Sequence, residues 1–261
     1  MKASMNPKES NLIDYQIMHM PVVDSTNEEA KRQGDAGAAH GSVFWADRQT
    51  AGKGRRGREW VSESAENLYF TLLLRPDLAT EKLSMLTLLM AYAVVQGLEK
   101  TTALEIKIKW PNDIVLGNKK VCGILSEMKL EGRSAAYCVI GVGINIGQKV
   151  FVQELQDKAT SLVAEGVQVD VESLLTVVLE AFAGLYDTFI ESGDLGFIMD
   201  KYNEMLAGRN GQVRVLEPGG EYEGKSLGIN RTGELLVEKK DGTVQEVFAG
   251  EVSVRGLYGY V

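Results

Sequence analysis

Three glycines and four cationic residues occupy one short segment, Gly52-Lys53-Gly54-Arg55-Arg56-Gly57-Arg58. Glycine lets backbone N–H groups approach an anion closely, and arginine forms strong charge-assisted bonds with phosphate or carboxylate. A mobile loop of this composition can close over an anionic ligand. The pattern also fits G-x-G-x-x-G, but residues 58–67 lack the helical period that a dinucleotide site requires, and no G-x-x-x-x-G-K-[ST] loop is present. A nucleic-acid patch and a solvated loop remain alternative interpretations.

The segment Lys109-Trp110-Pro111-Asn112-Asp113 places an amide and a carboxylate directly after a strand that ends at proline. Side chains at such a position can turn toward a cleft. An aspartate there can hold Mg²⁺ or orient a ligand. An Asn-Asp turn without a ligand explains the same residues equally well.

Two further segments carry weaker signals. Lys119 and Lys120 precede an apolar run, where a lysine can reach a ligand, although lysines at a hairpin tip are usually solvated. In Gly141-Val142-Gly143-Ile144-Asn145-Ile146, glycines inside a strand indicate close approach of another backbone or a ligand. Asn145 is then a polar group among apolar neighbours, and a structural bulge is an equally good explanation.

Hydrophobic periodicity predicts the elements that must position these segments. A helix is expected to begin at Asp24-Ser25-Thr26-Asn27, whose side-chain oxygens can cap it. Residues before Pro21 are polar and show little pattern, which indicates a short lead-in. Strands are expected at 42–46, 67–74, 105–110, 114–116, 121–128 and 137–146, and helices at 81–99 and at 171–206 with a break near Gly193.

The pattern changes after Gly208, where no helical period remains. Five short strands separated by glycine-rich turns predict a small closed barrel. The strands are expected at 213–216, 222–229, 234–238, 243–248 and 252–255. We therefore expect a lead-in at 1–20, a catalytic domain at 21–207 and a small β-barrel domain at 208–261, with the boundary near 206–209.

Composition excludes several classes of protein. The chain has 261 residues, 44% of them hydrophobic, which is ordinary for a globular protein. The formal net charge of −8 argues against a protein that coats nucleic acid by bulk charge. Two cysteines and two histidines rule out a disulfide scaffold and a Cys/His metal cluster. No signal peptide is visible, and residues 83–98 fall short of a membrane span, so a cytoplasmic protein is expected.

Taken together and in this order, the segments resemble those of the bacterial biotin protein ligases. The resemblance runs from about Val22 to Arg255 and is specific as an ordered set rather than in any single piece. The matching pieces are 24–27, 49–58 with Trp60 behind them, 109–113, Lys120 before 122–127, 141–145 and 250–255.

The resemblance implies an α+β fold: a catalytic domain with a mixed β-sheet and packed helices, class II synthetase-like, plus a small C-terminal SH3-like β-barrel. It implies that biotin and MgATP first give biotinyl-5′-AMP and pyrophosphate. One lysine of a biotin carboxyl carrier protein, such as that of acetyl-CoA carboxylase, then takes the biotinyl group. Neither nucleic acid nor a membrane is an expected partner, and a homodimer through an exposed sheet edge is left open.

The same resemblance assigns roles to individual residues. Lys120, Arg55 and Asp113 are the expected catalytic residues, and Asp113 is the expected Mg²⁺ ligand. The biotin-binding set is Ser25, Thr26, Asn27, Gln49, Lys53, Gly54, Arg55 and Lys120. The nucleotide-binding set is Arg58, Asn112, Asp113, Asn145 and Arg255.

Two departures from the family pattern matter. Only about 20 residues precede the Ser25 segment, too few for the winged-helix domain of the repressor members, so no repressor role is expected. Position 53 is Lys where the family usually has Arg, which keeps the charge and loses the bidentate fork. A lipoate ligase of the same superfamily and a nucleic-acid-binding module are the competing hypotheses.

Overall fold

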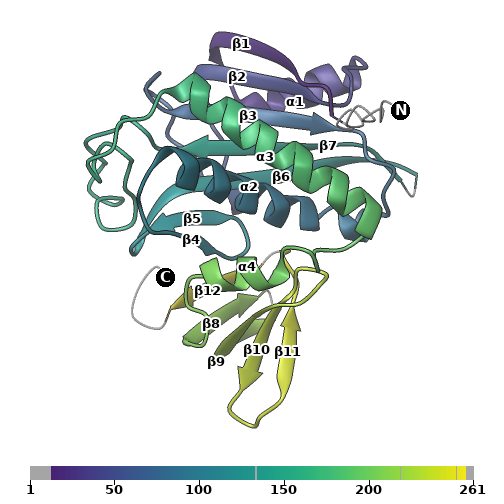
Figure 1. The fold of residues 1–261 in the computed structure, drawn as a ribbon, viewed down its shortest axis with the longest axis vertical. Coiled ribbons are helices and arrows are strands. Elements are labelled where there is room, and N and C mark those ends of the chain that lie inside the picture. Colours follow the sequence, from purple (N-terminus) through teal and green to yellow (C-terminus); the bar gives the residue numbers. More distant parts are fainter. Residues whose placement is uncertain (1–12, 133, 218, 251, 257–261) are drawn as a thin grey trace, which may run out of the picture.

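The chain folds around two β-sheets (Figure 1). The structure is a computed structural model that describes residues 13–132, 134–217, 219–250 and 252–256. The larger sheet contains β1 (Gln16–Val23), β2 (Ser42–Gln49), β3 (Leu68–Leu74), β4 (Ile106–Lys109), β5 (Asp113–Leu116), β6 (Lys119–Glu131) and β7 (Ser134–Ile144). Its strands lie in the order β1-β2-β3-β7-β6-β5-β4. The helices are α1 (Thr26–Asp35), α2 (Met85–Thr101), α3 (Val171–Ser192) and α4 (Met199–Met205).

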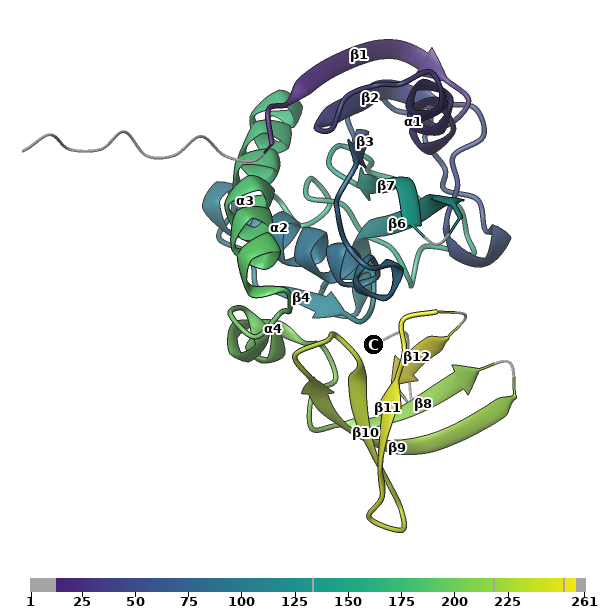
Figure 2. The ribbon, with the colours of Figure 1, turned by 90° about the vertical axis from the view of Figure 1, so that its right-hand side faces the viewer.

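The larger sheet is mixed, as expected. The β1–β2 pair is parallel with α1 as its crossover, and the other neighbours pair antiparallel. Helices α2 and α3 lie on one face and α1 on the other (Figure 2). Strand β3 is therefore buried along its whole length, because Leu72 joins the core under α2 while Leu73 joins the smaller core under α1. These layers fix the positions of the strands that carry the site.

Helix α3 begins and ends as its sequence indicates. The Asp170 side chain accepts a hydrogen bond of 2.8 Å from the Ser173 backbone N–H, and Gly193 ends the helix with a φ of 74°. The helix is long and apolar enough to cross a bilayer by length and composition alone. Its apolar residues, such as Leu174 and Phe182, are buried in the core that α2 shares.

The expectation of a patternless lead-in is wrong for residues 16–20, which form most of β1. The strand lies at the edge of the sheet and pairs only with β2 among the described residues. Nearly all its side chains are exposed, including Ile17 and Met18 on opposite faces. Only Met20 packs partly against a core, so the sequence of the strand has no regular alternation between apolar and polar residues that could identify it.

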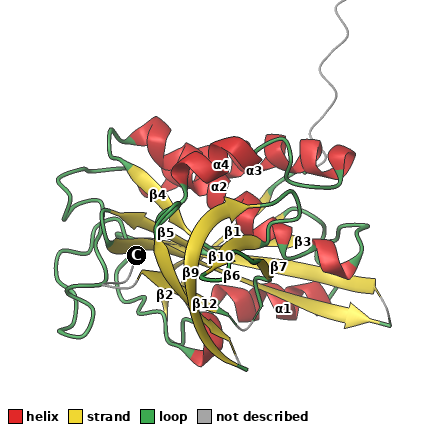
Figure 3. Ribbon diagram, turned by 90° about the horizontal axis from the view of Figure 1, so that it is seen from below, coloured by secondary structure: helices red, strands yellow, loops and turns green. Residues whose placement is uncertain are grey.

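The second sheet contains β8 (Gln212–Glu217), β9 (Gly220–Ile229), β10 (Leu235–Lys239), β11 (Val244–Val247) and β12 (Ser253–Gly256). All five predicted strands are present, but the predicted closed barrel is wrong. The order is β11-β10-β9-β8-β12, and within the described part of the chain β11 and β12 do not pair. The sheet is antiparallel throughout and lies below β4 and α4 in the view of Figure 1, and its strand β9 is curved, as Figure 3 shows.

Hydrogen bonds join the second sheet to the turn after β4 and to α4. The Trp110 indole N–H donates to the Gly233 carbonyl at 3.0 Å. The Asn203 side chain in α4 both accepts from the Ile229 N–H at 2.7 Å and donates to the Ile229 carbonyl at 3.1 Å. Buried polar groups that are paired in this way hold one relative orientation of the two sheets.

Candidate functional site

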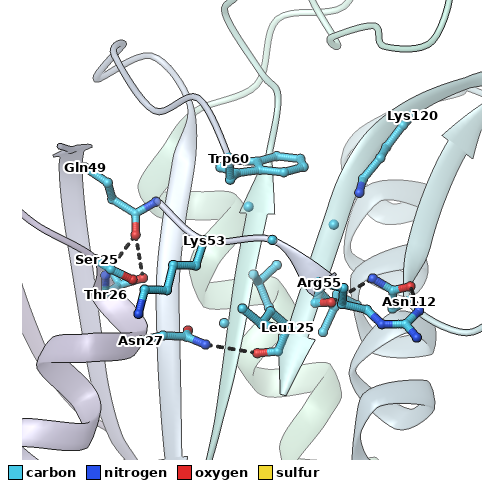
Figure 4. Close-up of a pocket in the computed structure, with 16 residues that line it drawn as sticks. Ser25, Thr26, Asn27, Gln49, Lys53, Arg55, Trp60, Asn112, Lys120 and Leu125 are labelled. Carbon is cyan, nitrogen blue, oxygen red and sulfur yellow. Dashed lines mark hydrogen bonds between the residues drawn. The ribbon is translucent and has the colours of Figure 1, made fainter. Parts of the chain in front are cut away.

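A pocket of about 420 Å³, open to solvent, lies on the larger sheet beneath the glycine-rich segment 52–58, which we call the flap. The pocket is built from the start of α1, the end of β2, the flap, and the middle of β6 and β7. Figure 4 shows Gln49, Ser25, Thr26 and Asn27 at one end, and Lys120, Arg55 and Asn112 at the other. Lys53 and Gly54 complete the predicted residues that line it.

The first end of the pocket is a hydrogen-bonded floor. Helix α1 begins at Thr26, and the hydroxyl of the N-cap residue Ser25 makes no capping bond. The Gln49 side-chain oxygen accepts from the Thr26 N–H at 2.8 Å, and the Gln49 amide nitrogen donates to the Ser62 hydroxyl at 2.8 Å. The floor therefore fixes Gln49 while the Ser25 hydroxyl is not used to cap the helix.

Asn27 is buried in the same floor with a defined amide orientation. Its nitrogen donates to the Glu127 carboxylate at 2.8 Å and to the Leu125 carbonyl at 3.2 Å. Its oxygen lies 2.7 Å from the Thr71 hydroxyl. An ionised carboxylate can only accept hydrogen bonds, so the Asn27 amide must present its nitrogen, and not its oxygen, to Glu127.

The glycines of β6 and β7 make room for side chains, whereas the sequence predicted the approach of another backbone or a ligand at Gly141 and Gly143. A methyl group at Gly141 would lie 2.0 Å from the Asn27 side-chain oxygen. A methyl group at Gly143 would lie 2.6 Å from the Trp60 ring, and one at Gly123 2.9 Å from the same ring. The Trp60 ring therefore packs against the backbone of β6 and β7 at glycines, which carry no side chain, and it forms one wall of the pocket.

Lys120 and Asp113 form an ion pair at the second end. The Lys120 ammonium lies 2.6 Å from an Asp113 carboxylate oxygen and 5.0 Å from the centroid of the Trp60 ring system. The backbone of Lys120 is held on both sides, by the Lys158 carbonyl and the Thr160 N–H. An ammonium has three donors, so Lys120 can contact Asp113 and still reach an anion in the pocket.

Arg55 connects the flap to two distant parts of the chain. Its guanidinium donates to the Asn112 side-chain oxygen at 2.7 Å, to the Gly250 carbonyl at 2.6 Å and to the Val252 carbonyl at 3.1 Å. The flap itself forms a short 3-10 turn at Arg55–Gly57, and no helix follows over 58–67. The dinucleotide interpretation is excluded, because that motif must open a helix.

Lys109 and Arg255 line a second open cavity of about 320 Å³, between β4 and the second sheet. Burial lowers the pKa of Lys109 to about 8; the Asp113 carboxylate opposes that shift, and the charges of Lys120, Arg255 and Arg58 add to it. The charges of one acid and several cations from the linings of both cavities and from the flap therefore act on Lys109, which makes this region a suitable environment for a polyanion.

The remaining predicted residues lie outside the pocket lining. Arg58 is exposed on the flap, and Arg255 faces the second cavity. Asn145 is buried, and its amide donates to the Thr160 carbonyl at 3.1 Å, which ties the segment after β7 to the sheet. Within the described residues no three His, Cys, Asp or Glu side chains cluster as a metal site.

Four residues that line the pocket or hold its lining in place were given no role from the sequence. Thr71 and Glu127 orient Asn27, Ser62 holds Gln49, and Gly123 supports Trp60. Strand glycines were the available signal for Gly123. Thr71 had no such signal, because its partner Asn27 lies 44 positions away in the sequence. Glu127, which is 100 positions from Asn27, belongs to the matching piece 122–127 but was given no role.

Comparison with known protein families gives two matches. Residues 19–145 match the Biotin/lipoate A/B protein ligase family. Residues 210–255 match the biotin protein ligase C-terminal domain. The first match contains most of the pocket, and the second contains most of the five-stranded sheet.

Individual relatives align over nearly the whole chain. The bifunctional ligase/repressor BirA of Bacillus spizizenii is 34% identical over 94% of this chain and 76% of its own length. The biotin–[acetyl-CoA-carboxylase] ligase of Paracoccus denitrificans is 35% identical over 89% of this chain and 98% of its own. The structure of Aquifex aeolicus biotin protein ligase in complex with biotin and ATP superposes with a TM-score of 0.82 at 32% identity, covering 92% of this chain and 98% of that one.

Proposed function

Because the chain belongs to the biotin protein ligase family, we propose that it activates biotin with ATP and transfers it to one lysine of a biotin carboxyl carrier protein. The observation that carries the proposal is the convergence of Lys120 and Arg55 on a pocket whose other end is a neutral hydrogen-bonding floor. One end suits the ureido ring of biotin, and the other suits its carboxylate and a nucleotide phosphate.

The first step joins two anions. An oxygen of the biotin carboxylate attacks the α-phosphorus of ATP, the bond to the β-phosphate oxygen breaks, and pyrophosphate leaves with its electron pair. Two unit charges about 4 Å apart repel by about 1 kcal/mol in water and by several times more in a drier site. Lys120 and Arg55 supply the opposing positive charge at fixed positions, which lowers the barrier without reorganisation.

In the second step the lysine amine of the carrier attacks the biotinyl carbonyl, and AMP leaves as the amide forms. The mixed anhydride hydrolyses readily, so it has to be kept from water until the acceptor arrives. We assign this role to the flap, with Arg55 as its anchor and Lys53 and Gly54 over the ligand. Arg58, Asn145 and Arg255 are proposed on the nucleotide side.

Magnesium enters the proposal as part of the substrate MgATP. Mg²⁺ usually takes one or two protein carboxylates and completes its shell with phosphate oxygens and water. Asp113 is a suitable single carboxylate, and Asn112 beside it is fixed by its bond to the Ile124 carbonyl at 2.9 Å. The ion would offset phosphate charge, while Asp113 also orients Lys120.

A direct assay tests the function. The protein is incubated with ATP, Mg²⁺, biotin and a carrier domain, and the carrier mass is measured. We expect a gain of one biotinyl group that requires ATP. A parallel reaction with lipoate separates this proposal from the lipoate ligase hypothesis, because a ligase specific for biotin leaves the carrier unmodified there. A carrier that gains lipoyl and no biotinyl group contradicts the proposal.

The narrower expectations belong to the same proposal: a cytoplasmic enzyme, without a repressor role and without a nucleic-acid partner. Titration with duplex DNA at two salt concentrations tests the last two. A nucleic-acid-binding module would bind with an affinity that falls steeply with salt. We expect no saturable binding.

A further inference from the structure

Three charged side chains that the sequence analysis left unassigned connect the flap to the pocket floor. The path runs from Lys53 through Glu28, Lys31 and Glu127 to Asn27. The successive contacts are Lys53–Glu28 at 2.6 Å, Glu28–Lys31 at 2.5 Å, Lys31–Glu127 at 3.0 Å and Glu127–Asn27 at 2.8 Å. Four of these side chains alternate in sign along the path, so each carboxylate lies between hydrogen-bond donors.

Glu28 links Lys53, which is on the flap, to the other side chains of this path. A single oxygen of its carboxylate contacts both the Lys31 and the Lys53 ammonium groups. Burial alone would raise the pKa of Glu28, but the two ammonium groups outweigh it and hold the pKa below its ordinary value. The pKa of Lys31 is raised, because Glu28 and Glu127 outweigh its burial. The charged forms of both residues are therefore the ones that the site stabilises.

We propose that Glu28 is a positioning residue: its carboxylate holds Lys53 and, through Lys31 and Glu127, aligns the Asn27 carboxamide with the ligand. The inference rests on the proposed roles of Lys53 and Asn27 in binding biotin. Glu28 itself is absent from the pocket lining and acts only through these neighbours.

The arrangement couples two events. A ligand that binds Asn27 holds that side chain in the position in which it contacts Glu127. A flap position that brings Lys53 to Glu28 stabilises the same chain of contacts from its other end. Coupling between two binding events is reciprocal. Binding of the neutral ureido head group should therefore favour the flap position that shelters the reactive end of the molecule.

Glu28→Gln tests the role, with Glu29→Gln as the matched control. Both residues lie in the first turn of α1, so both changes remove the same helix-dipole interaction. Glu29 instead contacts Arg32 and Gln33, away from the flap. We expect Glu28→Gln to raise the biotin Kd and the release rate of biotinyl-5′-AMP about two- to five-fold, the range for a partly exposed ion pair. The adenylation kcat and the thermal midpoint should stay near wild type.

A double-variant cycle excludes a merely structural effect. In the Lys53→Met background, Glu28→Gln should no longer change adenylate release, because its partner on the flap is gone. Multiplicative effects of the two substitutions, or equal effects of Glu28→Gln and Glu29→Gln, overturn the inference. A wild-type protein that forms no adenylate is a different result, since it refutes the proposed function itself.

Discussion

Lys120 is the residue on which the rate of the first step should depend most. Its ammonium lies between Asp113 and the pocket, on a backbone fixed from both sides. We expect Lys120→Ala to slow ATP–pyrophosphate exchange by about 10²–10³-fold, the usual loss for a preorganised donor. Lys119→Ala is the control, because the Lys119 ammonium bonds the Gln156 carbonyl. Exchange at the wild-type rate would remove Lys120 from its role.

Arg55 should control retention of the intermediate. Replacing it with glycine removes three hydrogen bonds, including both to the carbonyls at 250 and 252. We expect faster loss of biotinyl-5′-AMP to solution, measured as adenylate appearing in the filtrate of a single-turnover reaction. Arg56→Gly is the matched control, since Arg56 is exposed and has a φ of 59°, which glycine adopts without strain. Equal retention by the two variants would show that the flap does not depend on this anchor.

At the residue scale the sequence indicated which types of side chain would form the site, but not their partners. Arg55 and Asn112 could be named because they lie in the cationic glycine-rich segment and directly after the strand that ends at proline, whereas Lys120 was singled out only by the resemblance to the biotin protein ligases. Thr71 and Glu127 look like ordinary strand residues, and their contacts with Asn27 exist only after β3, β6 and β7 are paired.

Strand β7 carries a prediction at the scale of the element. Gly141→Ala places a methyl group 2.0 Å from the Asn27 oxygen, so Asn27 must move. We expect a loss of about 1–3 kcal/mol in the free energy of unfolding and weaker biotin binding by calorimetry. Gly184→Ala in α3 meets no atom within 4 Å and should instead stabilise by about 0.5–1 kcal/mol. Unchanged biotin affinity in the Gly141 variant would place the ligand elsewhere.

Elements with one buried face were predictable, and the edge strand was not. In β4 the residues Ile106 and Ile108 are buried while Lys107 and Lys109 are partly exposed. The alternation of apolar and charged residues in the sequence therefore indicates which face of the strand is buried. β1 has no such alternation, because most of its side chains are exposed and only Met20 packs partly against a core. Its strand character comes from pairing, which a local pattern does not contain.

The whole molecule should lose stability in mild acid through His40. Burial lowers the pKa of its imidazole, whose Nδ1 accepts the Arg75 N–H at 3.0 Å. The imidazole therefore binds a proton more readily in the unfolded chain than in the folded protein. Neutral His40 contributes fully to the free energy of unfolding above about pH 6.5, and this contribution declines as the pH falls below that value. We expect the slope to stay below about 1.4 kcal/mol per pH unit.

Urea unfolding at pH 7.5 and 5.0 measures this effect. His40→Asn keeps an acceptor for the Arg75 N–H and cannot be protonated, so its stability should fall less between the two pH values than that of the wild type. An identical difference for the two proteins would assign the acid sensitivity to other groups.

The global arrangement was the least predictable level. Five strands after Gly208 could be counted, but whether a sheet closes depends on whether its outer strands meet, and β11 and β12 do not pair among the described residues. The division into domains at 206–209 stays a prediction. The bonds of Trp110 and Asn203 to the second sheet show why local composition is a weak guide there, since their partners Gly233 and Ile229 lie 123 and 26 positions away in the sequence.

The carbonyl groups that anchor Arg55 come from residues 250 and 252, almost two hundred positions downstream. A ribosome therefore exposes the pocket floor, the flap and Lys120 well before it delivers the anchor. During that interval a nascent chain has the residues that contact both substrates but lacks the carbonyl groups that hold Arg55, and with them the flap, over an acyl phosphate. Synthesis order thus makes tight confinement a late property of this polypeptide, gained only when residues 250 and 252 have been added.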